Sequence, residues 1–406
     1  MAKPADRSTA LWVLRRLRDA GFEALFAGGC VRDMLLRRRC NDYDVATNAS
    51  PLQVKRLFDH VLLVGAAFGV AMVIRRGRKV EVTTFRSDVS YSDGRRPDAV
   101  RFSSREEDAQ RRDFTINGMF YDPIAEEVID TVGGREDLER RIVRTIGQPE
   151  QRFAEDYLRM VRAVRFAVAL EFQIESATAA AIAETAERIT AISGERIFDE
   201  LGKMLARKTA PAAMRKLREL GLARHILPEL LAEPLLWEES LQRVEAVAGR
   251  RQMGLSLGAL LAGLPAGDIR RIARRWGASN DLAAELCFYG DHLGDWPQAA
   301  AMPLCDFKRL MASGWFEDLH SLWKAEERRL TGKTAEARRI ADRAAGIAIA
   351  EVAPPPYVSG DDLIAMGLKA GPSLGRVLRQ LYDAQLNGEI RSRDEAFERA
   401  REICEL

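Results

Sequence analysis

The sequence predicts an α+β fold in which a mixed N-terminal region is followed by helices to the end of the chain. Over residues 1–145, short segments rich in β-branched and apolar residues, typical of strands, are interspersed with helical segments. From about residue 150 onward, apolar residues recur with the helical period of roughly 3.6. The chain therefore divides into an α+β part and an all-α body and tail.

The strands are all expected in the first 145 residues. Leu11, Leu14 and Leu17 recur at helical spacing and predict a first helix. After it we expect a strand at 23–26, a helix at 31–38, and strands at 61–64, 70–75, 79–85, 100–102 and 128–131. The polar segment 87–110 is expected to be a long loop around the strand at 100–102, and loops of this length are commonly functional or disordered.

Helices are expected in the remainder of the chain. Segments rich in Ala, Leu and Arg with helical periodicity lie at 153–170, 177–189, 198–205, 212–220 and 236–248. Three consecutive prolines at 354–356 predict a rigid break before a last helical segment at 361–406.

Composition excludes several classes of protein. The formal net charge is +2, from 62 Lys and Arg against 60 Asp and Glu, which excludes both a polycation and an acidic solvating tail. The longest uncharged apolar run, residues 61–74, is shorter than the roughly 20 residues of a membrane span, and the N-terminus lacks the pattern of a secretory signal. Five scattered cysteines and four isolated histidines argue against a zinc site and fit reduced thiols in a cytoplasm.

The first motif combines two glycines with a pair of carboxylates. Gly28 and Gly29 lie where a strand gives way to a helix, and glycines allow backbone N–H groups to approach a phosphate closely, with Arg32 able to add a charge-assisted bond. Asp42 and Asp44 are two residues apart, which on a strand places both carboxylates on one face. Either feature alone is usually a turn or a solvated loop, but together they fit Mg²⁺ bridging to phosphate oxygens.

Glu81 lies between β-branched residues on a predicted strand. Its carboxylate can face the same metal ions as a third ligand. The alternative is a strand residue that faces solvent, and the pattern does not decide between the two.

The second motif is residues 111–117. Its guanidinium groups can bind phosphates, and the side chains of Asp113 and Asn117 can hold ribose hydroxyls. A charged helix start with Asp113 near the cap is the alternative.

The third motif is residues 155–166. Asp156, Arg159 and Arg162 are spaced by three and are expected to form one polar ridge of a helix. Without context, an exposed helix with one ion pair is the commoner interpretation of this pattern.

These segments, in this order, resemble the motifs of the class II tRNA nucleotidyltransferase and bacterial poly(A) polymerase family. The glycines with Asp42 and Asp44 are similar to its motif A, and residues 111–117 are similar to motif B. Residues 130–138, 155–166 and 194–201 resemble motifs C, D and E. The resemblance covers residue 25 to about residue 205, half of the chain.

The resemblance implies a polymerase-β-like nucleotidyltransferase head with a small mixed sheet, followed by an all-α neck, body and tail. We place these domains at 1–145, 146–205, 206–350 and 351–406. It implies transfer of CMP and AMP from CTP and ATP to the 3′ end of tRNA, with pyrophosphate released and two Mg²⁺ ions held by Asp42 and Asp44. By the same match, Gly28, Gly29 and Arg32 hold the triphosphate, and Arg112, Asp113 and Asn117 hold ribose and phosphates.

Asp156 and Arg159 align with the family's amino-acid template for the incoming base, beside Arg162. The chemistry supports this role, because cytosine and adenine both present an exocyclic amine donor beside a ring-nitrogen acceptor. A carboxylate accepts from the amine and a guanidinium donates to the ring nitrogen, whereas guanine and uracil reverse both groups. Glu195 and Arg196 are expected to be structural and to steady the neck.

A glycine-rich tail segment, residues 367–376, suggests an RNA contact through backbone N–H groups, Lys369 and Arg376. A tight turn between helices is the alternative. We infer no protein partner and no membrane association.

The leading function is CCA addition, and the alternatives are CC-only or A-only addition to tRNA. A poly(A) polymerase is less favoured because residues 167–192 are rich in Ala and Glu rather than Arg. From other classes, the intact Asp42, Asp44, Arg112 and Asp156 argue against an inactive RNA-binding module. A nucleotidyltransferase for small molecules would not need the base-reading pair.

Overall fold

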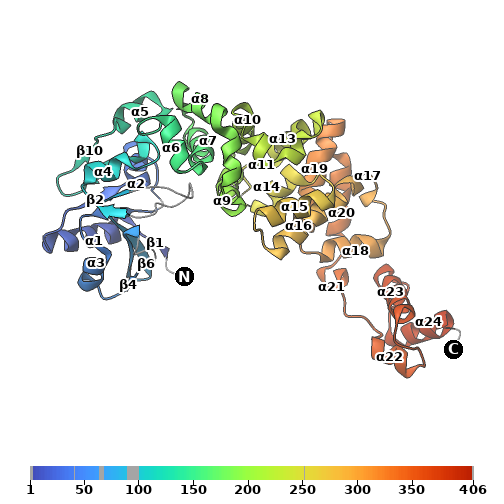
Figure 1. Cartoon of the computed structure of the whole chain (residues 1–406). Coiled ribbons are helices and arrows are strands. Elements are labelled where there is room, and N and C mark those ends of the chain that lie inside the picture. The colour runs from blue at the N-terminus through green and yellow to red at the C-terminus, as the bar shows by residue number, and fades with distance from the viewer. Residues whose placement is uncertain (1–2, 41, 64–67, 89–99, 251, 405–406) are drawn as a thin grey trace. The chain divides into compact units, whose positions relative to one another are not determined.

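The computed structural model describes residues 3–40, 42–63, 68–88, 100–250 and 252–404. It divides into two compact units, Met1–Pro228 and Glu229–Leu406, which are described separately here (Figure 1). The first unit carries the predicted strands and the second is helical, so the predicted α+β class is confirmed. The finer division into head, neck, body and tail stays a prediction.

A mixed sheet organises the first unit (Figure 1). Its strands are β1 (Lys3–Pro4), β2 (Ala24–Ala27), β3 (Asp44–Thr47), β4 (Val61–Leu62), β5 (Val70–Arg75), β6 (Arg78–Thr84), β9 (Phe120–Asp122) and β10 (Glu127–Ile129). The strand order is β10-β9-β2-β3-β6-β5-β4, with β1 also paired to β6. The pairs β3–β6 and β1–β6 are parallel and the other pairs are antiparallel.

Two short ribbons stand apart from this sheet. They are formed by β7 (Arg86–Asp88) with β8 (Val100–Phe102), and by β11 (Ile142–Val143) with β12 (Gln173–Ile174). The strands predicted at 70–75 and 100–102 coincide with β5 and β8 residue for residue. The others differ by one to a few residues at their ends, and the last residue of the strand predicted at 61–64 lies outside the described residues.

Helices pack against the sheet, and the strand β2 buries both of its faces. Along β2 all four residues are buried, and the side chains of Leu25 and Ala27 pack with Ala109 and Phe120 in one cluster. The helices of this unit are α1 (Arg7–Asp19), α2 (Gly29–Leu35), α3 (Pro51–Leu57), α4 (Arg105–Gln110), α5 (Gly134–Arg140), α6 (Pro149–Glu155), α7 (Leu158–Leu170), α8 (Ser176–Thr185), α9 (Gly194–Leu205), α10 (Ala210–Glu219) and α11 (Ala223–Ile226). Short 3₁₀ helices are η2 (Thr115–Asn117) and η3 (Ala186–Ala191).

Two expectations were wrong in this unit. Of the loop predicted at 87–110, residues 89–99 lie outside the described residues, 87–88 belong to β7, and 105–110 form α4, which begins after Ser104 because that side chain accepts from the Glu107 N–H. The helix predicted at 153–170 is two helices, α6 and α7, separated by Asp156, whose backbone is extended at φ −156° and ψ 101°. Asp156 therefore does not lie on one helical ridge with Arg159 and Arg162.

The second unit is built from helices. They are α13 (Pro234–Val247), α14 (Met253–Leu261), α15 (Ala266–Arg275), α16 (Asn280–His292), η4 (Leu293–Asp295), α17 (Trp296–Ala299), α18 (Leu304–Ala312), α19 (Phe316–Thr331), α20 (Ala335–Ala345), α21 (Ile349–Val352), α22 (Gly360–Ala365), α23 (Pro372–Asn387) and α24 (Arg393–Cys404). The helix α12 (Pro228–Leu231) begins at the last residue of the first unit. The last three helices share a core cluster that includes Leu363 and Leu381. Among the described residues, no helix combines the length and the apolar character that crossing a membrane requires.

Candidate functional site

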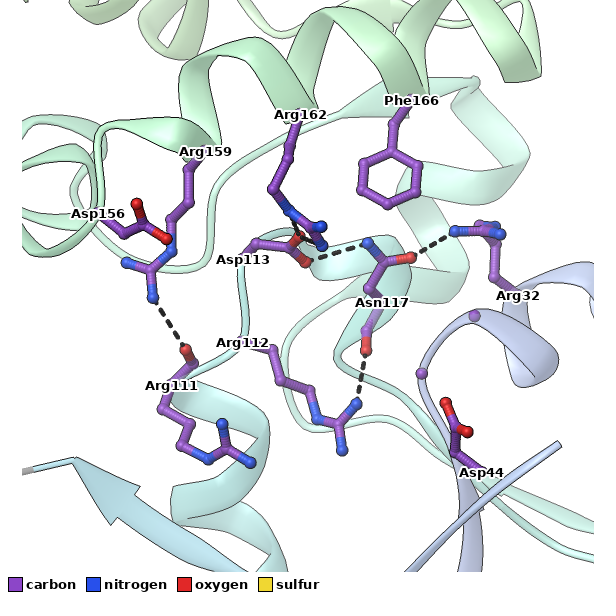
Figure 2. Close-up of a pocket in the computed structure, with 12 residues that line it drawn as sticks. Arg32, Asp44, Arg111, Arg112, Asp113, Asn117, Asp156, Arg159, Arg162 and Phe166 are labelled. Atoms are coloured by element: carbon purple, nitrogen blue, oxygen red, sulfur yellow. Dashed lines mark hydrogen bonds and ion pairs between the residues drawn. The ribbon is translucent and has the colours of Figure 1, made fainter. Parts of the chain in front are cut away.

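The first unit contains a cavity of about 430 Å³, which we call the first cavity (Figure 2). Ten predicted site residues line it: Gly28, Gly29, Arg32, Asp44, Arg112, Asp113, Asn117, Asp156, Arg159 and Arg162. Arg111 and Phe166 complete the lining. Residues that are more than a hundred positions apart in the sequence therefore meet around one space.

The glycine loop is held against an arginine of the second motif. Gly28 has φ +72°, in the region that favours glycine, and a Cβ atom there would lie 2.9 Å from Nη1 of Arg112. A side chain at this position would therefore push Arg112 away from the loop. The glycine backbone and the Arg112 guanidinium group therefore lie close together at this end of the first cavity.

A chain of hydrogen bonds crosses the first cavity from Arg32 to Arg162 (Figure 2). Arg32 Nη1 donates to Asn117 Oδ1 at 2.7 Å, and Asn117 Nδ2 donates to Asp113 Oδ1 at 3.0 Å. Arg162 donates through Nε and Nη2 to Asp113 Oδ2 at 3.0 and 2.5 Å. Phe166 lies between these two arginines (Figure 2), with the guanidinium carbons of Arg32 and Arg162 5.2 and 5.3 Å from its ring centre.

This chain fixes the ionisation of Asp113. Burial opposes the charged form, but Arg162, the Asn117 amide and the Phe114 N–H together hold the pKa of the Asp113 carboxyl well below its usual range. Asp113 is therefore an acceptor at neutral pH, and its two oxygens are already oriented before a ligand arrives.

Replacing Asp113 by asparagine is expected to change acid stability. A carboxyl whose pKa is lowered by folding stabilises the fold above its unfolded pKa, about 4, and loses that contribution as pH falls toward the folded value. The variant should therefore unfold at a lower temperature than the parent at pH 7, and the difference should shrink below about pH 4. Thermal unfolding followed by circular dichroism across this range checks it, with Asp59→Asn, an exposed carboxylate, as control. A difference of the same size at every pH would contradict the assignment.

Asp156 and Arg159 are fixed by partners on three sides. Arg196 on α9 donates to both Asp156 oxygens, at 3.1 and 2.7 Å, and the Leu158 N–H donates to Oδ1 at 3.1 Å. Arg159 Nη1 donates to Glu155 Oε2 at 2.5 Å and to the Arg152 carbonyl at 2.6 Å. Asp156 lies between α6 and α7, and its side chain lines the first cavity together with that of Arg159.

Three further residues of the site were not among the predicted site residues. Arg152 Nη2 donates to the carbonyls of Arg111 and Arg112 at 2.5 and 2.7 Å, and its Nη1 pairs with Glu155. Asp108 pairs with both motif arginines through its carboxylate. All three are ordinary charged helix residues in the sequence, and the signals of a contact are spacings: Asp108 lies three and four residues before the two arginines, and Glu155 lies three residues after Arg152 and four before Arg159.

A second cavity of about 230 Å³ adjoins the first, and Asp44, Arg111 and Arg112 line both. Glu81 on β6 lines only the second cavity. Burial, with the charges of Glu81 and Asp42, raises the pKa of Asp44 to about 7, and burial with Asp42 also raises the pKa of Glu81. Three carboxylates that repel one another in a partly buried site are a donor set that a hard divalent cation stabilises, because it neutralises them.

Asp42 lies just before β3 rather than on it. Its side chain is exposed, and Oδ1 accepts from the backbone N–H of Ala5 at 3.3 Å and of Tyr43 at 3.0 Å. Within the described part of the chain, no three His, Cys, Asp or Glu side chains come together as a ready-made metal cluster. The ligand role of Glu81 therefore stays a proposal.

Lys369 and Arg376 lie in the second unit, separately from both cavities. Lys369 precedes α23 and Arg376 is in its second turn, and both residues are exposed. The preceding turns contain Gly367 and Gly371, both at positive φ. The turn between helices that was the alternative interpretation is present, and an RNA contact there remains untested.

Comparisons with known proteins show which proteins the chain resembles. The family model for the Poly A polymerase head domain matches residues 24–144, and the model described as the probable RNA and SrmB-binding site of polymerase A matches residues 171–233. A CCA-adding enzyme of Limosilactobacillus reuteri is 34% identical over 399 residues, which cover 95% of this chain and 94% of the relative.

Two solved structures extend the likeness to the fold. The CCA-adding enzyme of Bacillus stearothermophilus in complex with CTP has a TM-score of 0.79 and 33% identity, and the match covers 98% of each chain. The Thermotoga maritima CCA-adding enzyme complexed with tRNA has a TM-score of 0.65 and 19% identity, over 98% of this chain and 96% of that one, which is a likeness of fold alone.

Proposed function

Because this chain belongs to the family of CCA-adding enzymes, we propose that it adds CMP and AMP from CTP and ATP to the 3′ end of tRNA. The observation that carries the proposal is that the Asp156–Arg159 pair and Asp44 line one cavity. A base-reading pair and a carboxylate suited to metal binding thereby line the same space as the guanidinium groups of Arg32, Arg112 and Arg162. Such a space suits a nucleoside triphosphate.

Two Mg²⁺ ions fit the carboxylates of this site, with Asp42 and Asp44 as ligands and Glu81 as a third candidate. When bound, such ions stabilise the charge that develops on the attacking and leaving oxygens. The protein's own groups bind and orient the nucleotide. Gly28, Gly29, Arg32 and Arg112 hold the phosphates.

Asp113 and Asn117 accept from and donate to the ribose hydroxyls, while Asp156 and Arg159 select the base. The second cavity is the approach we assign to the RNA 3′ end, because Asp44 and Glu81 both line it. The 3′ oxygen bonds to the α-phosphorus, the bond to pyrophosphate breaks, and the hydroxyl proton leaves to solvent.

The test is addition to tRNA transcripts that end at the discriminator base, at C or at CC, with CTP and ATP supplied singly or together. Addition of three nucleotides in the order C, C, A, without UMP or GMP, is the expected result. Arrest after CC, or activity on the CC-ended transcript alone, would assign the divided activity instead. Long A tails on unrelated RNA would assign a poly(A) polymerase, and no transfer to any RNA would overturn the proposal.

We expect the tail to contribute to RNA binding. The double variant Lys369→Ala with Arg376→Ala should bind tRNA roughly tenfold more weakly and show a shallower dependence of affinity on salt, because each lost phosphate contact reduces counterion release. Filter binding at several KCl concentrations measures both. Lys369→Arg with Arg376→Lys keeps the charge and should bind as the parent does, whereas an unchanged affinity in the alanine pair would remove the tail from the RNA-binding surface.

We also place the enzyme in the cytoplasm. Support comes from the five cysteines, all of which are free thiols in the structure. Alkylation of cells before lysis, followed by mass spectrometry, would detect these thiols as reduced.

A further inference from the structure

Asp108 is a buried carboxylate that the nucleotide chemistry does not use directly. It lies on α4 with none of its surface exposed, and it does not line either cavity. Two other acidic residues of the same helical turn, Glu106 and Glu107, are exposed and suffice to complement the helix dipole. The helix dipole therefore does not explain why position 108 carries a charge.

Its partners are the two arginines that both cavities share. Arg111 donates to Asp108 Oδ1 through Nε and Nη2, at 2.9 and 2.6 Å. Arg112 donates to Asp108 Oδ2 through Nε and Nη2, at 3.2 and 2.9 Å. The backbone N–H of Arg86, on β7, also donates to Oδ1 at 3.3 Å. One carboxylate thus holds one edge of each of two guanidinium groups.

The edge that is held decides where the rest of the group points. With Nε and Nη2 of Arg112 turned to Asp108, its Nη1 faces the Asn117 carbonyl at 3.4 Å (Figure 2). The same Nη1 would lie 2.9 Å from a Cβ atom at Gly28, so it is close to the backbone there. The bond to Asn117 is long, so Nη1 is available to a phosphate oxygen at the glycine loop. Asp44 is a second carboxylate within electrostatic reach of Arg112. The Arg112 guanidinium group bonds to Asp108 instead.

Stability alone does not explain such a group. Burying an ion pair costs desolvation that its attraction often only offsets, and apolar side chains of similar volume frequently replace such pairs without loss of stability. A role in orienting two substrate-binding guanidinium groups explains why a buried charged residue is kept at this position.

We propose that Asp108 is a positioning residue for nucleotide binding: it fixes the orientation of Arg111 and Arg112, and so fixes the point at which Arg112 meets the triphosphate. The proposal rests on the proposed function for the identity of the ligand. It concerns a step that can be measured without RNA.

The experiment compares CTP binding and CTP turnover. Equilibrium dialysis of labelled CTP with Mg²⁺, without RNA, is expected to show a Kd raised about tenfold in Asp108→Asn, and KM for CTP should rise in parallel, because the charged acceptor that aligns Arg112 is lost. Asp122→Asn removes another ion-paired carboxylate of the same unit, bonded to Arg18 at 2.6 Å, and touches neither cavity. This control should leave the Kd for CTP unchanged.

A double-mutant cycle separates positioning from general destabilisation. If Asp108 acts through Arg112, then Asp108→Asn should raise the Kd for CTP less than about twofold when Arg112 is already alanine. If the two substitutions together raise the Kd for CTP by the product of their separate effects, the proposal is overturned. It is also overturned if Asp108→Asn alone lowers the melting temperature but leaves the Kd for CTP at the parental value.

Asp108→Glu serves if the asparagine variant does not fold, because it keeps the charge and displaces the two acceptor oxygens by one methylene. It should still raise the Kd for CTP several-fold, since displacements near 1 Å are costly at such sites. A parental Kd in this variant would also overturn the proposal. If the parent protein binds CTP but transfers no nucleotide to tRNA, the proposed function is overturned. The Kd values for CTP of the parent and the Asp108 variants still test the role of Asp108.

Discussion

Asp44→Asn is expected to lower the rate of nucleotide transfer at least about a thousandfold, while CTP binding changes far less. Loss of a metal-binding carboxylate removes several kcal/mol of transition-state stabilisation, and roughly 1.4 kcal/mol corresponds to each factor of ten in rate. Asp44 is the residue with the strongest claim to this role, because it begins β3 and its side chain lines both cavities.

Single-turnover assays with saturating CTP and a tRNA ending at the discriminator base measure the effect on the chemical step. Asp59→Asn, which alters an exposed carboxylate on the same unit, is the matched control and should transfer nucleotides at the parental rate. A variant at position 44 that retained more than about a tenth of the rate would remove this carboxylate from the metal site.

Asp156→Ala and Arg159→Ala are each expected to relax the choice of nucleotide more than they weaken binding of CTP. A site that hydrogen-bonds its ligand through buried polar groups can reject the wrong ligand by roughly 10⁴-fold, because a mismatch leaves those groups unpaired. Losing one member of the pair should reduce the preference for CTP over UTP by about a hundredfold or more. The rise in KM for CTP should be smaller, because the arginines at the phosphates remain.

The measurement is kcat/KM for each of the four nucleoside triphosphates on the same tRNA. Arg196→Ala should produce an intermediate loss of selectivity, because Arg196 holds both Asp156 oxygens without lining the first cavity. Arg188→Ala, at an exposed position in η3, is the control. Unchanged selectivity in Asp156→Ala and Arg159→Ala would show that other groups read the base.

The strands were predictable where local pattern and burial agree. The strand β5 alternates buried and half-buried residues and is followed by Arg76 and Gly77 at positive φ, and both signals are visible in the sequence. The helix α4 was also readable, because Ser104 and Glu107 form an N-terminal capping pattern. A loop was expected over residues 105–110 because the segment is polar in composition, and the capping pattern was not given enough weight.

The break at Asp156 could not be predicted locally. No proline or glycine marks it, and apolar residues continue with helical spacing on both sides. The extended conformation is stabilised from a distance, by Arg196 forty residues further along the chain. For the same reason the sequence did not separate Asp108, Arg152 and Glu155 from ordinary surface charges, since burial and long-range pairing are properties of the folded chain.

Arg152 and Arg159 bind main-chain atoms of the second motif. Arg152 donates to the carbonyls of Arg111 and Arg112, and Arg159 reaches the Arg111 carbonyl at 3.4 Å. Every amino acid carries a carbonyl, so these contacts do not depend on which side chains occupy positions 111 and 112. A change of side chain at either position would therefore leave these bonds to α6 and α7 in place, so the packing of residues 111 and 112 against the two helices tolerates substitution there.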